Sequence, residues 1–449
     1  MDFINQIFNA GIVGCGGAGF PTHVKLNTKT EYFILNGAEC EPLLYTDRWL
    51  MIHKAGDIVR AASAIAAHLC ASHAVIALKT SYAREIRALE QAITEQKTTI
   101  SIFKMASFYP AGDEQMIVHE VTGRTVPPGG IPLDVGAVVS NIATVCAVAG
   151  ALDGTPFTEK YLTVTGLVSN PCVIHTPLGA GINECIATAG GAKNQDYCVL
   201  LGGPMMGKII SKKEAALTPV TKTTSGIVIL PAENRLLSYQ ESNLRHTLNR
   251  ARAACIQCTF CTELCPRYLL GHPLEPHRVM RALSSCGSFD DALELPEARH
   301  ALLCCECGVC ELFACPMQLQ PRKVNMILKQ LFAQSGIRYE KTGEEPAPHQ
   351  DRESRKVPTK RAAVRAGVGD FTKIENFSFF EQTAKILTLP LRQHIGKPAL
   401  PVVSQGEKVA RGQLIAACPE NGLGANLHAP VAGTVVSVDE KAIMIEAKE

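Results

Sequence analysis

The sequence predicts a multidomain α/β protein, and three observations support that prediction. Strand-like and helix-like apolar segments alternate over the first third of the chain, which is typical of an α/β layer built on a parallel sheet. Two closely spaced cysteine runs follow between Cys255 and Cys315. Short strand-like segments separated by glycines come last, and the 449 residues suffice for two to four domains.

Bulk composition narrows the classes of function. The net charge is only +2 and both signs are mixed along the chain, so the sequence predicts no nucleic-acid partner. Residues 1–6 lack the basic and apolar regions of a signal peptide, and polar residues interrupt the apolar stretch 135–152, so we expect no membrane span. Many of the 18 cysteines form C-x2-C pairs, which indicate metal binding in a reducing compartment, so we expect a cytoplasmic protein.

The N-terminal segment combines a helix with a glycine-rich loop. Residues 3–8 place apolar side chains on one helical face, which a core helix explains better than a docking peptide. Between Gly11 and Lys25, glycines allow backbone N–H groups to wrap a phosphate. Three of these glycines also fit G-x-G-x-x-G. No strand precedes them and Phe20-Pro21 replaces the expected helix start, so we reject a Rossmann site.

Polar side chains follow the predicted strands of the first domain. The pattern predicts strands at 32–35, 73–79 and 99–105 and helices at 47–70 and 81–91. Asn36, Glu39 and Glu41 follow the first strand, and the stretch 109–115 follows another. Ligands of such sheets bind beyond the strand ends. Asn141 lies in an otherwise apolar run, where helix capping explains it as well as ligand contact does.

The middle of the chain predicts a small β-grasp module. A strand at 160–166, a short helix at 179–190 and a Gly/Met-rich stretch at 199–207 follow one another within few residues. A structural spacer explains this stretch as well as a ligand site does.

The cysteine runs predict two iron–sulfur clusters. Cys255 to Cys265 has the ferredoxin spacing C-x2-C-x2-C-x3-C-P, and Cys304 to Cys315 repeats it with one more residue in the last gap. The fourth cysteine of each run ligates the other cluster in two-cluster ferredoxins. One predicted cluster therefore has Cys255, Cys258, Cys261 and Cys315 as ligands, and the other has Cys304, Cys307, Cys310 and Cys265.

Zinc is the alternative for these cysteines. Zinc sites usually use two separated pairs, so the doubled run of three plus Cys-Pro favours iron–sulfur. Cys305 is surplus, either a bystander or a rival of Cys304 for one iron. Predicted helices at 244–254, 275–285, 290–300 and 321–332 would surround the two clusters.

The end of the chain changes character twice. Residues 336–373 are polar and rich in both charges, which predicts a linker. Residues 388–449 space glycine turns between short strands and resemble a biotinyl/lipoyl-type barrel-sandwich hybrid. The hairpin that would carry a modified lysine is absent, so we expect an unmodified structural domain. Its lead-in, 391–398, resembles the RnfC component of the Rnf electron-transport complexes, where this module comes first.

The glycine loop and the acidic turns resemble, in residues and in order, the flavin-binding subunit of respiratory complex I. There the glycine loop and lysine bind FMN phosphate, and the acidic turns line the flavin and NADH site. The resemblance implies FMN contacts at Gly14, Gly16, Gly17, Gly19, Lys25, Asn36, Glu39, Glu41, Asp113, Glu114 and Asn141. Glu114 and Glu39 would act in catalysis.

Two positions depart from complex I. Cys15 stands where complex I has arginine, and Asp113-Glu114 stands where it has two glutamates, so the nicotinamide contacts are less secure than the FMN contacts. An inert side chain explains Cys15 better than a redox-active one. The β-grasp stretch resembles the soluble-ligand-binding (SLBB) domain that follows the flavin fold in the same family.

The domain order resembles the cobalamin reductases of propanediol-utilising bacterial microcompartments over essentially the whole chain. The expected divisions are a complex I flavin-subunit-like domain (1–155), an SLBB-type β-grasp module (156–235), a helical two-[4Fe-4S] domain (236–335), a linker (336–380) and a barrel-sandwich hybrid (381–449).

This resemblance implies a reductase that passes electrons from NADH through FMN and two [4Fe-4S] clusters to the cobalt of cobalamin. FMN converts a two-electron hydride into single electrons, and the clusters carry these onward. The implied partners are a corrinoid, met on an adenosyltransferase, and shell or enzyme proteins of a microcompartment. An NADH-oxidising subunit of a membrane Rnf-type complex and a non-catalytic electron conduit remain open alternatives.

Overall fold

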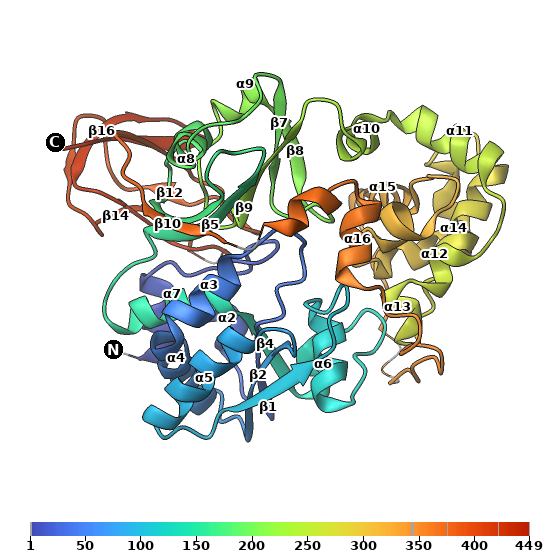
Figure 1. Cartoon of the computed structure of the whole chain (residues 1–449), viewed down its shortest axis with the longest axis horizontal. Coiled ribbons are helices and arrows are strands. Elements are labelled where there is room, and N and C mark those ends of the chain that lie inside the picture. The colour runs from blue at the N-terminus through green and yellow to red at the C-terminus, as the bar shows by residue number, and fades with distance from the viewer. Residues whose placement is uncertain (1, 342, 344, 375, 421, 449) are drawn as a thin grey trace.

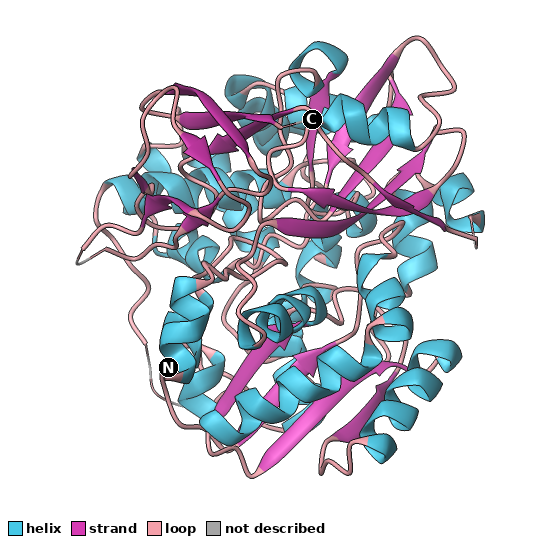
Figure 2. Cartoon of the chain, turned by 90° about the vertical axis from the view of Figure 1, so that its left-hand side faces the viewer, coloured by secondary structure: helices cyan, strands magenta, loops and turns pink. Residues whose placement is uncertain are grey.

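A computed structural model of the chain describes residues 2–341, 343, 345–374, 376–420 and 422–448. Four parts follow in sequence order (Figure 1): an N-terminal α/β domain, a β-grasp domain, a helical cysteine domain, and a C-terminal β domain that returns to the side of the β-grasp. Figure 2 shows the parallel sheet with helices on both faces, below the two β-rich parts.

The N-terminal domain is built on a four-stranded parallel sheet in the order β3-β2-β1-β4. Its strands are β1 (Tyr32–Asn36), β2 (His73–Lys79), β3 (Ser101–Met105) and β4 (Ala137–Asn141). Its helices are α1 (Phe3–Asn9), α2 (Thr22–Leu26), α3 (Thr46–His53), α4 (Ala55–His68), α5 (Ala83–Glu95), α6 (Glu114–Thr122) and α7 (Ile142–Leu152). Alternate residues of β1 enter two cores: Phe33 and Leu35 pack with α4 and α7, while Ile34 packs with α6.

The strands and helices predicted for this domain are confirmed, with shifts of a few residues at their ends. The predicted helix 47–70 is two helices, α3 and α4, because Lys54 leaves the helical conformation between them.

The β-grasp domain contains a six-stranded sheet in the order β10-β6-β5-β9-β7-β8. Its elements are β5 (Glu159–Gly166), β6 (Cys172–Pro177), α8 (Ile182–Thr188), β7 (Tyr197–Leu201), β8 (Lys208–Ser211), α9 (Lys212–Ala215), β9 (Gly226–Pro231) and, far along the chain, β10 (Ser378–Glu381). One apolar core joins this sheet to the C-terminal domain, since Leu162 and Ile227 pack in the same cluster as Leu389 and Ile443.

The C-terminal domain consists of two small sheets, β11-β17-β16-β13 and β12-β14-β15. Its strands are β11 (Ile386–Pro390), β12 (Leu400–Pro401), β13 (Lys408–Val409), β14 (Leu414–Ala417), β15 (Leu427–His428), β16 (Gly433–Val438) and β17 (Ala442–Ala447). This arrangement agrees with the predicted barrel-sandwich hybrid.

The cysteine domain is helical, as predicted. Its elements are α10 (Arg235–Glu241), α11 (Leu244–Ala254), α12 (Phe260–Glu263), α13 (Pro266–Leu269), α14 (Pro276–Ala282) and α15 (Pro321–Gln334), with the short helical turns η2 (Leu283–Ser285), η3 (Asp291–Glu294), η4 (Pro296–Leu303) and η5 (Val309–Ala314). The predicted α-helix at 290–300 is wrong in type: η3 and η4 are 3-10 turns, and Pro296 interrupts the segment.

The predicted linker is folded over much of its length, and this corrects the expectation for residues 336–380. It contains α16 (Thr359–Arg365), η6 (Gly369–Lys373) and most of β10. Ala362 and Ala363 are buried in a core shared with the other domains, and Val357 pairs with Tyr109 in a β-bridge. Arg352 is buried in an ion pair with Glu120 of α6. The prediction of a linker rested on polar composition. Composition shows that these residues are charged, but it does not show that their charges pair with residues of other domains.

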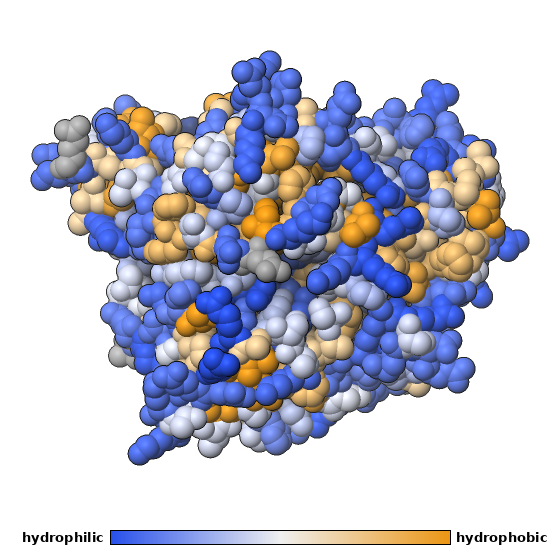
Figure 3. All heavy atoms as spheres, viewed as in Figure 1, coloured by the Kyte–Doolittle hydropathy of each residue, from blue (hydrophilic) through white to orange (hydrophobic). Residues whose placement is uncertain are grey.

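Hydrophilic side chains cover most of the face drawn in Figure 3, and hydrophobic ones form scattered patches. Within the residues that the structure describes, no helix has the length and apolar character needed to cross a bilayer.

Candidate functional site

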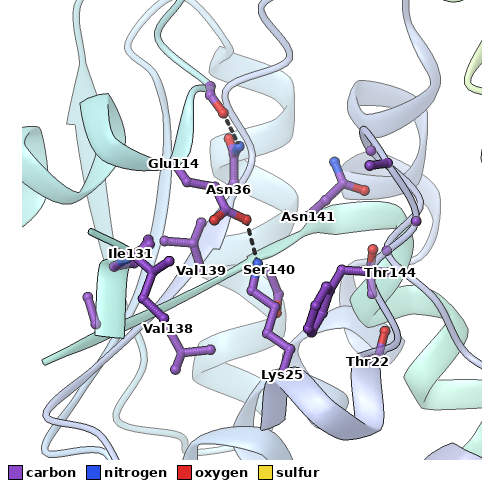
Figure 4. Close-up of a pocket in the computed structure, with 18 of the residues that line it drawn as sticks. Thr22, Lys25, Asn36, Glu114, Ile131, Val138, Val139, Ser140, Asn141 and Thr144 are labelled. Carbon is purple, nitrogen blue, oxygen red and sulfur yellow. Dashed lines mark hydrogen bonds and ion pairs between the residues drawn. The ribbon is translucent and has the colours of Figure 1, made fainter. Parts of the chain in front are cut away.

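A cavity of about 760 Å³ opens at the carboxyl ends of β1 and β4 (Figure 4). Asn36 ends β1 and Asn141 ends β4, so the sheet itself delivers both amides to the cavity. Of the predicted site residues, those in its lining are Gly14, Gly16, Gly19, Lys25, Asn36, Glu39, Glu114 and Asn141. Eight of the eleven predicted FMN contacts therefore lie on one continuous surface.

The glycine loop forms one wall. Its ends are closed by a bond from the Gly14 N–H to the Phe20 carbonyl (2.9 Å), and the Cys15 N–H donates to Thr144 Oγ1 on α7 (2.9 Å). Gly17 and Gly19 have φ of +93° and +71°, a conformation that other residues rarely adopt. A Cβ at Gly16 would lie 3.6 Å from the Asn141 amide, so bare backbone at this position widens the cavity.

Charged and amide side chains form the opposite wall. Lys25 points across the cavity to an ion pair with Glu114, the first residue of α6 (Figure 4). The Asn36 amide donates to the Gly112 carbonyl (2.8 Å). Asn141 caps α7 through the Ala143 N–H (2.9 Å), so the capping interpretation is confirmed while the side chain also faces the cavity.

Two buried acids, Glu39 and Asp47, line the cavity. Burial, with the nearby Asp47 and Glu41 carboxylates, raises the pKa of Glu39 well above its usual range. Burial also raises the pKa of Asp47 to about 6 although the Asn141 amide donates to it (2.6 Å). Lys79 and Tyr82 bond the Glu39 carbonyl, which fixes the acidic turn beside the flavin-sized space.

Three predicted FMN contacts lie outside this lining. Gly17 is solvent-exposed at the tip of the loop. Glu41 turns to the β-grasp domain and accepts the Met205 N–H (3.0 Å), and burial raises its pKa to about 7. Asp113 caps α6 and pairs with Arg267. As direct contacts to FMN these three gain no support from the geometry, because none of them lines the cavity.

The cysteines gather into two rings. Cys255, Cys258, Cys261 and Cys315 surround a cavity of about 20 Å³, and Cys265, Cys304, Cys307 and Cys310 surround one of about 10 Å³. The fourth cysteine of each run thus lies with the other run, as the ferredoxin spacing predicted. Cys305 joins the second ring as a fifth thiol, so its role stays open.

These rings fit iron–sulfur clusters chemically. Among the described residues, no three His, Cys, Asp or Glu side chains converge closely enough to hold a single metal ion. Each ring instead leaves a small central space between four thiols. Burial raises the pKa of Cys261 to about 12 and that of Cys304 to about 11.

Two contacts that the sequence did not indicate join the N-terminal domain to the cysteine domain beside the second ring. Tyr109 is buried and donates from its hydroxyl to the Cys307 carbonyl (2.7 Å). Arg267, two residues after Cys265, pairs with Asp113 (2.9 Å) and donates to Gln115 at the start of α6. Arg267 follows a Cys-Pro pair, but no local pattern predicts its partner 154 positions away.

The apolar part of the cavity wall was also not predicted. Phe20 and Ile131 line the cavity and are 41% and 53% exposed, and Leu133, Val138 and Val139 complete the wall. Flat apolar walls of this kind suit an aromatic ring system. They come from separate segments, which explains why a scan along the sequence did not find them.

Family models match four successive segments of the chain. Residues 7–150 match the Nuo51 FMN-binding domain, 161–208 the SLBB domain, 254–320 the 4Fe-4S dicluster domain and 372–449 the RnfC barrel sandwich hybrid domain. The four predicted domain types are therefore confirmed, including an FMN-binding domain and a 4Fe-4S dicluster domain. The predicted boundaries between them stay predictions.

Curated relatives match at greater length. Cobalamin reductase PduS of Salmonella typhimurium is 40% identical over 440 residues, which cover 97% of this chain and 94% of the relative. The protein of the same name in Citrobacter freundii is 39% identical over 437 residues, with the same coverage. The RnfC-type component of the proton-translocating ferredoxin:NAD(+) oxidoreductase complex of Clostridium ljungdahlii is 34% identical, but over only 60% of this chain and 56% of its own. The chain belongs to the cobalamin reductase PduS family.

Proposed function

We propose that this protein is a flavin iron–sulfur reductase that takes electrons from NADH and delivers them singly, through two [4Fe-4S] clusters, to cobalamin. The observation that carries this proposal is that the domain with the flavin-sized cavity is bonded to the second cysteine ring and to the segment that follows it. Tyr109 and Arg267 make that connection by direct bonds between the two domains. A domain that only stored or sensed a flavin would not need a cysteine ring bonded to it.

FMN fits the cavity with its phosphate at the glycine loop. Gly16 and Gly19 would offer backbone N–H groups, since the Gly14 N–H already bonds to the Phe20 carbonyl, and Lys25 would supply a positive charge. Asn36 and Asn141 would contact the ring system from the strand ends. When bound, FMN accepts a hydride and releases electrons one at a time.

The acids of the cavity would manage protons and the dinucleotide. Glu114 lies across the cavity from the glycine loop and is half-exposed, so it can meet the NADH ribose or amide. Burial raises the pKa of Glu39, which favours the protonated carboxyl, so Glu39 would donate a hydrogen bond or hold a proton beside the flavin. Both roles rest on the complex I resemblance together with this geometry.

The two rings would carry electrons away from the cavity. The ring of Cys265, Cys304, Cys307 and Cys310 touches the flavin domain, so it would accept first. The acceptor is proposed to be corrinoid cobalt, reduced from Co(III) towards Co(II) and Co(I), because the most extensively matching relatives are cobalamin reductases. The corrinoid would be met on a partner adenosyltransferase, in a microcompartment that degrades propanediol.

An anoxic NADH titration of the full chain, followed by visible absorbance, tests the proposal. We expect the flavin band and the broad iron–sulfur absorbance both to bleach, and cob(III)alamin then to reoxidise them. If NADH bleaches neither while dithionite bleaches the clusters, the protein is a conduit and the proposal fails.

A role as the NADH-oxidising subunit of a membrane Rnf-type complex is the second candidate, and it has less support. The Rnf relative matches 60% of this chain, whereas the PduS relatives match 97%. Isolation of the native protein would separate the two, because the proposal expects shell proteins among its partners and the alternative expects membrane proteins.

A further inference from the structure

Outside the cavity lining, and bonded to the segment that leads into the glycine loop, lies a buried lysine that the proposed function does not use. Lys222 follows the helix α9 of the β-grasp domain and has no exposed surface. Its ammonium donates to the Gly11 carbonyl (2.7 Å) in the N-terminal domain and to the Asn426 carbonyl (2.6 Å) in the C-terminal domain. One side chain therefore ties three domains together.

The contacts of this lysine meet the entry to the glycine loop. Gly11 has φ of +68° and lies three residues before Gly14, the first glycine of the cavity lining. A Cβ on Gly11 would lie 2.3 Å from the Asn426 carbonyl oxygen and 3.0 Å from the lysine nitrogen, so the fit is tight. Any shift of Lys222 would move the chain that leads into the loop.

Neighbours of Lys222 hold the exit of the same loop. A Cβ on Gly19 would lie 2.7 Å from Thr223 Cγ2 and 3.1 Å from the backbone of His394. The Ile395 N–H donates to the Ala18 carbonyl (3.0 Å). These two segments are joined, because Gln393 Oε1 accepts the backbone N–H of Lys222 (2.9 Å). The loop is thus fixed from behind at both ends while its front faces the cavity.

The surroundings of Lys222 carry little compensating charge. Its hydrogen-bond acceptors are carbonyl groups, and the titratable groups that face it are Cys15, Lys160, His394 and His428. Burial and the nearby Lys222 lower the pKa of His428 to about 4, and burial lowers that of His394, so both are neutral at pH 7. Burial also lowers the pKa of Lys222 itself to about 7. A dianion in front of the loop would favour the charged ammonium behind it.

We propose that Lys222 is a positioning residue for the phosphate of the flavin: it fixes the glycine loop from behind and places a positive charge under the phosphate. The inference rests on the proposed FMN site and adds to it a requirement for the β-grasp and C-terminal domains. It also gives the C-terminal domain a role that needs no modified lysine.

The test compares FMN with riboflavin, which lacks the phosphate, by quenching of flavin fluorescence on the full chain with its clusters. In Lys222→Met we expect FMN to bind about tenfold more weakly, the size of a lost charge-assisted contact, and riboflavin to change less than about twofold. The control is Lys323→Met, a half-buried lysine of the cysteine domain, which donates to the Tyr239 and Ser242 carbonyls and makes no bond to the loop. It should leave the ratio of the two affinities unchanged.

A second measurement on the unchanged protein guards against a variant that fails to fold. As pH rises from 6.5 to 8.5, through the lowered pKa of about 7, Lys222 should lose its proton, so the preference for FMN over riboflavin should decrease. A flat preference, or equal losses of both ligands in Lys222→Met, overturns the inference. If the unchanged protein binds no FMN at all, the proposed function fails instead.

Discussion

Replacing Arg267 by methionine should loosen the contact between the flavin domain and the second cysteine ring. The Arg267 and Asp113 side chains are 10% and 16% exposed, and their charged atoms are 2.9 Å apart. Removing one partner of a fully buried pair costs about 3–5 kcal/mol. Asp113 keeps its bonds to two N–H groups of α6 and some solvent, so we expect about 2–3 kcal/mol.

Hydrogen exchange measures this cost where it arises. In peptides that span α6 and α13, protection should fall by roughly 30-fold to 150-fold, the equivalent of 2–3 kcal/mol. NADH should also bleach the clusters more slowly in Arg267→Met, while the rate with dithionite stays the same. The control is Arg355→Met, which removes a half-exposed pair with Glu263 in the same region and should change protection by less than about fivefold.

A double-mutant cycle isolates the pair. Asp113→Asn keeps a good helix cap but removes the charge, so the double variant should cost about 1–3 kcal/mol less than the sum of the single ones. If Arg267→Met lowers protection no more than Arg355→Met does, the ion pair does not hold the two domains together and the reasoning is refuted.

Three further predictions concern the acids, the rings and the loop. Burial raises the pKa of Glu41 to about 7, so the contribution of its protonated carboxyl to stability is present below about pH 4.3 and is lost as pH rises to about 7. In urea unfolding, Glu41→Gln should remove about 2–4 kcal/mol of this dependence of the unfolding free energy on pH. Parallel plots of unfolding free energy against pH for the two proteins would contradict the prediction. Cys258 and Cys265 belong to the same run but to different rings, so Cys258→Ser and Cys265→Ser should each lower the iron content from about eight to about four atoms per chain. The double variant should then lose nearly all of its iron. If each run instead ligated its own cluster, the double variant would keep about four atoms. Gly19→Ala should weaken FMN binding at least tenfold, since φ is +71° and the new Cβ would lie 2.7 Å from a β-grasp side chain. Gly336→Ala, with the same φ and nothing within 4 Å, is the control, and equal affinities for the two variants would be evidence against a role for the loop.

Features with a local physical cause could be predicted from the sequence. The cysteine spacing indicated both rings because thiols two residues apart can face one centre. The bounds predicted for α11, Leu244–Ala254, and for β2, His73–Lys79, are the observed ones. The amides Asn36 and Asn141 were located because the strands that they end carry them to one edge of the sheet.

Features that depend on partners far along the chain were not predicted. Glu41 has the sequence context of a flavin-site acid, yet Met205 of another domain determines where its carboxylate points. The segment 336–380 has the composition of a linker, yet Glu120 pairs with its Arg352 and the β-grasp sheet accepts its last residues as β10. In both cases the observed conformation is stabilised by a contact between segments more than 150 residues apart, and no short window of sequence contains both segments.

The C-terminal domain lies close to the start of the chain. It matches the RnfC barrel sandwich hybrid domain, and here it follows the cysteine domain. In the fold it lies against the N-terminal helix, since the Asn426 amide donates to the Phe8 carbonyl, and both chain ends lie on the same side in Figure 1. A module joined ahead of α1 could therefore reach the same place beside the glycine loop as one joined after β10, so this contact does not depend on where the module stands in the chain.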